Sequence, residues 1–247
     1  MVKKTRILCL HGGASNNDIT AFQTMGLKLG SRMECIYLNA PHLSRCCYPG
    51  LDRLSDGPWY IWSDISKGLE HQEDQWDESL EHLAKYCKEN GPFDGVYGFS
   101  QGTAIITDFS HPNIWKDKFK MKSCPWKFAI LACGGASHQV TLKRGMTVKI
   151  PSFHIWGKKD RILNDSKTIA EYWDPPMRVT HSHGRGHEID VQMCYREGEM
   201  MKKLSKFLDD HLDSNKGLIE SVRKVISDIP MPEMYLFGRS FGGKLSD

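Results

Sequence analysis

The amino-acid sequence predicts a doubly wound α/β fold, in which a mostly parallel sheet carries helices on both faces. Short apolar runs alternate with helical patterns along almost the whole chain. Most of these runs are continuously apolar, which is typical of strands that are covered on both sides. The length of 247 residues and the hydrophobic content of 40% allow one large core, so we expect one main domain.

Six runs are predicted to form strands, because each is short, apolar and followed by small or polar residues. In chain order they span residues 5–10, 33–40, 95–99, 127–135, 151–157 and 176–184. Side chains just beyond a strand can point back over the carboxyl edge of the sheet, where α/β folds bind their ligands. Residues that follow these runs are therefore candidates for a site.

Two helices are predicted from apolar residues that recur on one helical face. The first lies within residues 73–91, where Asn90-Gly91-Pro92 stops it, and the second within residues 199–212. Their apolar positions are Trp76, Leu80, Leu83, Ala84 and Cys87 in the first, and Met200, Leu204, Phe207, Leu208 and His211 in the second.

Two segments depart from this alternation. Residues 41–68 are rich in turn-forming residues but contain Trp59, Tyr60 and Trp62. A long connection of this kind within a compact domain more often has a function than not. We expect this segment to cover a pocket within a main domain of residues 1–213. Residues 214–247 are more polar and are expected to be a C-terminal extension of uncertain order.

Composition and charge exclude several classes of partner. The net charge of +3 comes from 33 basic and 30 acidic residues without a basic stripe, so nucleic acid is not an expected partner. No apolar run approaches the roughly 20 residues of a membrane span, and the N-terminal "ILCL" is too short for a signal peptide. The eight cysteines show no Cys-x-x-Cys spacing, which favours free thiols in a reducing compartment, the cytoplasm or also the nucleus. The oligomeric state stays open.

The chain contains two Gly-x-Ser-x-Gly motifs, around Ser100 and Ser240. This pattern places a serine on a tight turn between a strand and a helix. Ser100 follows the apolar "FDGVY" and precedes the helical pattern "TAIITDF". The motif of Ser240 ends at Gly242 and is followed by five residues, which leave no room for a helix or for a downstream acid and histidine. We therefore predict that Ser100 is the nucleophile and that Ser240 lies in a loop or tail.

Ser100 has candidate partners further along the chain. Asp160 follows a predicted strand in "FHIWGKKD", and His187 lies in a glycine-rich turn after the last strand. The chain order Ser, Asp, His is that of α/β-hydrolases. We expect His187 to accept the serine proton and Asp160 to hold the imidazole in place. Asp165 is a competitor for the acid, but it precedes a helical pattern and is interpreted as its cap.

An oxyanion hole is predicted in the turn after the first strand. The sequence His11-Gly12-Gly13 allows backbone N–H groups to approach a substrate oxygen. The N–H groups of Gly13 and of Gln101, the residue after the nucleophile, form the expected pair. We expect His11 to orient this turn, and Trp59 and Trp62 either to wall an acyl pocket above Ser100 or to anchor their loop.

A metal site is not expected. His181, His183 and His187 suggest a zinc motif, but Arg185 and Gly186 occupy positions where that motif needs an acid and a histidine. An arginine cation beside a metal ion is electrostatically unfavourable. The reaction of an activated serine requires no cofactor.

The segments "ILCLHGGASNN", "ENGPFDGVYGFSQGTA", "HIWGKKDRIL" and "GRGHEI" resemble the FSH-type serine hydrolases. That family includes fungal hydrolases, ovarian tumour-suppressor-like esterases and certain polyketide-releasing thioesterases. The resemblance covers about residues 5–212 and implies an α/β-hydrolase that acts on esters or thioesters, with Ser100, Asp160 and His187 at the triad positions. Arg185 interrupts the usual Gly-Gly-His, and the segment after about Ser214 has no counterpart.

The function predicted from the sequence is acyl hydrolysis through an acyl-serine intermediate on a small-molecule ester or thioester. The alternative is a binding protein that keeps the hydrolase fold without turnover, for which a missing triad residue would be the sign.

Overall fold

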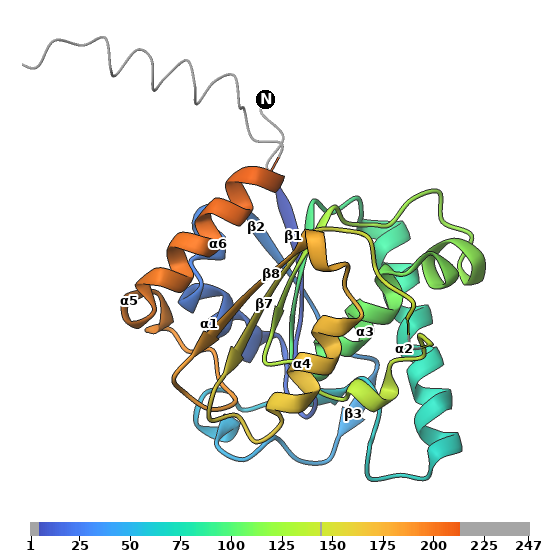
Figure 1. The fold of residues 1–247 in the computed structure, drawn as a ribbon. Helices are drawn as coiled ribbons and strands as arrows, with labels where there is room; N and C mark the ends of the chain where they lie inside the picture. Colours follow the sequence, from blue (N-terminus) through green and yellow to red (C-terminus); the bar gives the residue numbers. More distant parts are fainter. Residues whose placement is uncertain (1–4, 144, 213–247) are drawn as a thin grey trace, which may run out of the picture. The chain divides into compact units, whose positions relative to one another are not determined.

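A parallel sheet of six strands forms the centre of the structure, in the order β2-β1-β5-β6-β7-β8 (Figure 1). The computed structural model describes residues 5–143 and 145–212. Every neighbouring pair in this sheet is parallel. The strands are β1 (Arg6–Leu10), β2 (Glu34–Leu38), β5 (Gly95–Phe99), β6 (Phe128–Ala132), β7 (Ser152–Gly157) and β8 (Arg178–His183). All six predicted strands are thus confirmed. The predictions for residues 214–247, Ser240 included, lie outside the described residues.

Helices cover both faces of the sheet, which confirms the doubly wound arrangement (Figure 1). One face carries α1 (Asn17–Gly26) and α6 (Gly198–His211). The other carries α2 (Leu69–Asn90), α3 (Gln101–Ser110) and α4 (Leu163–Glu171). The remaining helical turns are the short α5 (Met193–Arg196), the 3-10 turns Leu29–Ser31, Leu51–Arg53, Ser137–Gln139 and Pro175–Met177, and the π-turn Asn113–Lys118. Each described helix is too short or too polar to cross a bilayer.

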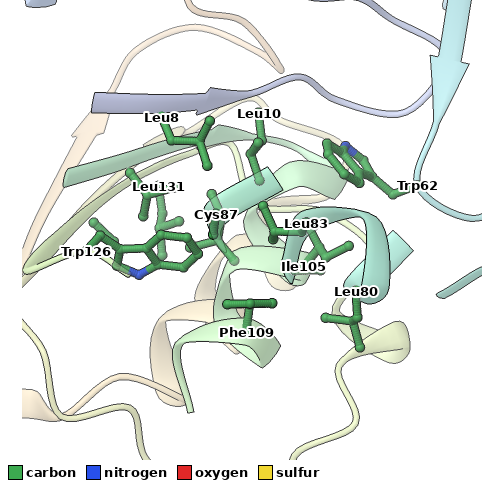
Figure 2. Close-up of a cluster of buried hydrophobic side chains, with 14 of the residues drawn as sticks. Leu8, Leu10, Trp62, Leu80, Leu83, Cys87, Ile105, Phe109, Trp126 and Leu131 are labelled. Atoms are coloured by element: carbon green, nitrogen blue, oxygen red, sulfur yellow. The ribbon is translucent and has the colours of Figure 1, made fainter. Parts of the chain in front are cut away.

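Two hydrophobic cores lie against the two faces because neighbouring residues of a strand point to opposite sides. In β1, Leu8 and Leu10 pack with the side chains of α2 and α3, whereas Ile7 and Cys9 pack with those of α6. Figure 2 shows the first of these cores, where Leu83 and Cys87 of α2 lie near Phe109 of α3. The predicted apolar faces of both helices are therefore the faces that pack.

Residues 41–68 contain a small antiparallel hairpin, which the sequence did not predict. Its strands are β3 (His42–Ser44) and β4 (Trp59–Ile61), and a bridge between Tyr60 and Ser15 joins it to the turn after β1. The Tyr60 N–H donates to the Ser15 carbonyl at 2.8 Å, and the Ser15 N–H donates to the Tyr60 carbonyl at 3.1 Å. The hairpin is thus held against the carboxyl edge of the sheet.

Candidate active site

Ser100 lies on a sharp turn between β5 and α3. Its φ of 50° and ψ of −121° place it in the left-handed half of backbone space, where non-glycine residues are strained. A Cβ atom at Gly98 would lie 2.4 Å from Ile106 Cδ1, and one at Gly102 would lie 2.7 Å from the His11 carbonyl oxygen. The two glycines of the motif therefore allow β1, β5 and α3 to approach closely.

The three residues of the predicted triad form one chain of hydrogen bonds. His187 Nε2 lies 3.0 Å from Ser100 Oγ, and His187 Nδ1 lies 2.8 Å from Asp160 Oδ2. Asp160 is 7% exposed, and its Oδ1 accepts the Ile162 N–H at 2.9 Å. The geometry is that of a serine, a base in hydrogen-bond reach, and an acid that orients the base.

Asp165, the competing acid, lies away from this chain. It lies in the first turn of α4, and its Oδ1 accepts a hydrogen bond from the Ser137 hydroxyl at 2.5 Å. The residue at the N-cap position of α4 is Ile162, so the interpretation of Asp165 as the cap is wrong. The choice of Asp160 as the residue beside His187 agrees with the geometry.

Cys133 lies beside the triad, at the carboxyl end of β6. Among the described residues, Cys133, Asp160 and His187 are the group of three potential metal ligands whose ligand atoms lie within 4.8 Å of one another. Burial raises the pKa of the Cys133 thiol, and the nearby Asp160 charge adds to this effect. The thiol donates a weak hydrogen bond to the Glu188 carbonyl at 3.7 Å. A metal ion here would need to displace the Asp160–His187 hydrogen bond, so these residues fit the triad better than a metal centre.

His11 holds the glycine turn after β1 in place. It is fully buried; its Nδ1 donates to the Gly12 carbonyl at 2.6 Å, and its Nε2 accepts the Ala40 N–H at 2.9 Å. Burial lowers the pKa of His11 to about 4, although the Gly12 carbonyl opposes this shift. The ring is therefore neutral near pH 7 and orients the turn, as the sequence predicted for it.

Gln101 joins three segments around the nucleophile. Its Oε1 accepts the Trp62 N–H at 3.1 Å, and its Nε2 donates to the Ser63 carbonyl at 2.7 Å and to Gln139 Oε1 at 2.9 Å. A Cβ atom at Gly13 would lie 3.1 Å from Gln101 Oε1, so the two predicted oxyanion-hole residues are neighbours. The side chain of Gln101 thus holds the backbone after Ser100 against the end of β4.

An apolar cavity of about 440 Å³ opens beside Ser100 and His187. Its walls come from three parts of the chain that are distant in sequence: α1, the segment 48–54, and the segment 187–191 that follows β8. The apolar lining residues are Ile19, Phe22, Tyr48, Pro49, Leu51, Leu54, Phe99, Ile189 and Val191. Within the predicted covering loop 41–68, the part that borders the cavity is thus 48–54.

The prediction that Trp59 and Trp62 wall the acyl pocket is wrong, because neither residue lines this cavity. Trp62 is fully buried in the core between the sheet and α2, where Figure 2 shows it near Leu10. Its indole N–H donates to the His11 carbonyl at 2.9 Å. Trp59 is half-buried and packs near Gly57. The two tryptophans therefore anchor the hairpin, which was the alternative interpretation.

His181 and His183 lie on β8, which leads into the turn that bears His187. His183 is buried, and its Nδ1 accepts the Arg185 N–H at 3.3 Å. His181 Nε2 lies 3.7 Å from Glu197 Oε2. Arg185, the residue that departs from the family pattern, pairs with Glu188 on the surface. Both histidines are thus strand residues behind the turn, as expected.

Comparison with known proteins places the chain among serine hydrolases. A family model described as serine hydrolase (FSH1) matches residues 1–193. The chain is 30% identical over 209 residues to the Esterase FPY3 of Fusarium mangiferae, which covers 74% of this chain and 88% of that protein. It is 27% identical over 220 residues to the Esterase OVCA2 of Danio rerio, which covers 78% of this chain and 93% of that protein.

Solved structures share the fold at lower sequence identity. The esterase PE8 is 19% identical with a TM-score of 0.54, and the alignment covers 85% of this chain and 93% of that one. A Bacillus cereus carboxylesterase is 17% identical with a TM-score of 0.50, covering 85% and 89%. These likenesses support the α/β-hydrolase fold that the sheet order and the helices display.

Proposed function

The chain belongs to the serine hydrolase (FSH1) family, and from this premise we propose that it cleaves carboxylic esters or thioesters through an acyl-serine intermediate on Ser100. The observation that carries the proposal is the chain of hydrogen bonds from Ser100 Oγ through His187 to Asp160. Curated relatives named as esterases support ester cleavage.

In the proposed first step, Ser100 Oγ attacks the carbonyl carbon of the substrate. His187 Nε2 removes the hydroxyl proton and then passes it to the departing alcohol or thiol. The Asp160 carboxylate accepts a hydrogen bond from His187 Nδ1, which fixes the tautomer and stabilises the imidazolium that forms. In the second step His187 Nε2 takes a proton from a water molecule whose oxygen attacks the acyl carbon. The bond between this carbon and Ser100 Oγ then breaks, His187 returns the proton to Ser100 Oγ, and the carboxylic acid leaves.

The negative charge that develops on the carbonyl oxygen needs backbone donors. We assign this role to the N–H groups of Gly13 and Gln101, at the turn after β1 and the first residue of α3. Loss of one such donor typically costs about 2.7 to 4 kcal/mol of transition-state stabilisation. The His11 hydrogen bonds and the Gln101 side chain would hold these two segments in position.

The acyl group of the substrate would occupy the apolar cavity between α1 and the segments 48–54 and 187–191. An apolar acid rather than a sugar or peptide fits this lining. The choice between ester and thioester is open, because the acyl half of the reaction is the same for both. A panel of 4-nitrophenyl esters and acyl thioesters of graded chain length separates these substrates.

All eight cysteines lie in the described part of the chain, and none of them forms a disulfide there. Cysteines without disulfides fit, as a proposal, a reducing compartment such as the cytoplasm.

The proposal is tested with a fluorophosphonate probe, which labels activated serines. Wild-type protein is expected to be labelled and to hydrolyse 4-nitrophenyl esters, and Ser100→Ala is expected to lose both properties while keeping its circular dichroism spectrum. A folded Ser100→Ala protein with wild-type turnover would overturn the assignment. A folded wild type without labelling or turnover would favour the alternative of a silent binding protein.

A further inference from the structure

Arg161 directly follows Asp160, the acid of the proposed triad, and is exposed. Its guanidinium carbon lies 5.2 Å from the centroid of the Tyr48 ring. Tyr48 in turn lines the cavity, and its ring centroid lies 6.4 Å from that of His187. One aromatic ring therefore separates this cation from the proposed base.

The charge of Arg161 is not used by a carboxylate of the described protein. Within residues 5–143 and 145–212, no ion pair within 4.0 Å involves Arg161. By contrast, Arg185 pairs with Glu188, and Arg196 pairs with Asp190. The stack on Tyr48 covers one face of the guanidinium and leaves its N–H edge available.

Ile162, the residue after Arg161 in the chain, lies beside Ser100 on a side that the apolar cavity does not occupy. A Cβ atom at Gly135 would lie 2.9 Å from Ser100 Oγ and 3.1 Å from Ile162 Cδ1, so Ile162 borders the nucleophile. Neither Gly135 nor Ile162 lines the apolar cavity. With an acyl chain in the cavity, the departing oxygen or sulfur would face Ile162. Arg161 precedes Ile162 in the chain and lies over Tyr48, a residue of the cavity wall.

We propose that Arg161 binds an anionic group, a carboxylate or a phosphate, on the leaving group of the substrate. A planar guanidinium matches both groups because it can donate two parallel N–H bonds. The exposed Lys158 and Lys159 precede it and add positive charge to the same edge. This inference rests on the proposed hydrolase function and adds a class to its substrates: esters or thioesters of an anionic alcohol or thiol.

The test compares two chromogenic butyrates that differ by one carboxylate, 4-nitrophenyl butyrate and 3-carboxy-4-nitrophenyl butyrate. Full-length wild type, Arg161→Met and Arg161→Lys are assayed with both esters. Arg161→Met is expected to lower kcat/KM for the carboxylated ester about tenfold or more, mainly through KM, and to change the neutral ester less than about twofold. Arg161→Lys is expected to lose less kcat/KM than Arg161→Met, because lysine keeps the positive charge but cannot donate two parallel N–H bonds.

A second pair of substrates distinguishes the two anions. Butyryl-coenzyme A carries phosphates, and butyryl-N-acetylcysteamine presents a similar thioester without them. A loss in Arg161→Met restricted to the coenzyme A substrate assigns a phosphate, and a loss restricted to the carboxylated ester assigns a carboxylate. Equal losses with neutral and anionic substrates, or no loss with either, would overturn the proposal and leave Arg161 as a packing partner of Tyr48.

Failure of this inference is separable from failure of the proposed function. Hydrolysis of 4-nitrophenyl butyrate by the wild type, absent in Ser100→Ala, supports the function whatever the Arg161 variants do. If the wild type hydrolyses none of the four substrates, the function fails and the inference falls with it.

Discussion

His11 and His154 are buried histidines whose pKa values lie far below the ordinary value of about 6.5. Burial lowers the pKa of His11 to about 4, and burial together with the nearby Arg178 cation lowers that of His154 to about 3. Both rings are neutral in the folded protein near pH 7. Unfolding would return them to water, where they take up protons below about pH 6.5.

The pKa of Asp108 is shifted so that this residue favours the folded state at low pH, unlike the two histidines. Burial raises its pKa to about 6, although hydrogen bonds from the Trp76 indole and the Thr141 N–H favour its charged form. Between about pH 4 and pH 6, folded Asp108 therefore keeps a proton that the unfolded chain releases. This carboxyl stabilises the fold as the pH falls, whereas the two histidines destabilise it.

We predict that the free energy of unfolding decreases on acidification from pH 6 to pH 4. In this window the unfolded chain binds two protons, on His11 and His154, that the folded protein does not bind, and the folded protein binds one, on Asp108, that the unfolded chain does not. The net difference of about one proton corresponds to a decrease of about 1.4 kcal/mol per pH unit from these three groups. Urea denaturation at pH 6 and at pH 4.5 measures it.

A His154→Gln variant is the matched control, because glutamine can keep a hydrogen bond to Ser152 Oγ without taking up a proton. This variant is expected to be less stable than wild type at pH 6. Its free energy of unfolding should nevertheless change less between the two pH values. The proton that unfolded His11 takes up is then nearly balanced by the proton that folded Asp108 keeps. Equal slopes for both proteins would show that His154 is not neutral in the folded state.

The proximity of the three residues of the proposed triad could be predicted from the sequence, because each one follows a strand that is recognisable as a short apolar run. Ser100, Asp160 and His187 stand just after β5, β7 and β8, and a parallel sheet brings those strand ends to one edge. Tyr48 could not be predicted in the same way. Its place beside His187 depends on how a turn-rich segment folds back, and no local spacing encodes that path.

At the scale of elements, the contact between β1 and α3 determines the position of Ser100, the proposed nucleophile. A Cβ atom at Gly102 would meet three backbone atoms of Leu10 and His11, the nearest at 2.7 Å. Backbone cannot yield as a flexible side chain can. Gly102→Ala would therefore push α3 away from β1 and displace the backbone around Ser100.

We predict that Gly102→Ala costs about 1 to 3 kcal/mol of stability, the usual range for overpacking a core. It should also lower kcat for neutral esters, because Ser100 and the Gln101 N–H move together. Gly198→Ala is the control: no atom lies within 4 Å of the added Cβ, and alanine favours the first turn of α6. The melting temperature and the rate of ester hydrolysis are measured for both variants. A Gly102→Ala protein as stable and as active as Gly198→Ala would show that β1 and α3 are not in close contact at Gly102.

The hairpin of β3 and β4 marks where prediction from sequence failed at this scale. Its strands are three residues each, too short for an alternating pattern to stand out, and they pair across a turn-rich connection. The burial of Trp62 depends on partners from other elements, the His11 carbonyl and Gln101 Oε1. The aromatic residues of the loop thus indicated that the segment 41–68 matters, but the contacts predicted for Trp59 and Trp62 were wrong.

At the scale of the whole molecule, the apolar cavity beside Ser100 is assembled from segments that meet only in the folded chain. Phe22 comes from α1, Leu51 and Leu54 from the connection between β3 and β4, and Val191 from the turn after β8. A Cβ atom at Gly26 would lie 1.9 Å from the Asp190 carbonyl oxygen, so α1 and this last turn pack directly together. Such a cavity has no signature in any single stretch of sequence.

The last prediction concerns selectivity for the acyl chain. Phe22 lies on α1 and lines the cavity, so Phe22→Ala is expected to enlarge it and shift the preferred 4-nitrophenyl ester to a longer chain. Phe22→Trp is expected to shift the preference to a shorter chain. Each additional buried methylene contributes about 0.8 kcal/mol, or roughly a fourfold change in kcat/KM. The measurement is kcat/KM for 4-nitrophenyl esters from acetate to dodecanoate.

Trp59→Ala is the control, because Trp59 lies outside the cavity and should leave the ratio of kcat/KM between chain lengths unchanged. If Trp59→Ala shifts the preference and the Phe22 variants do not, the acyl chain binds elsewhere than in this cavity.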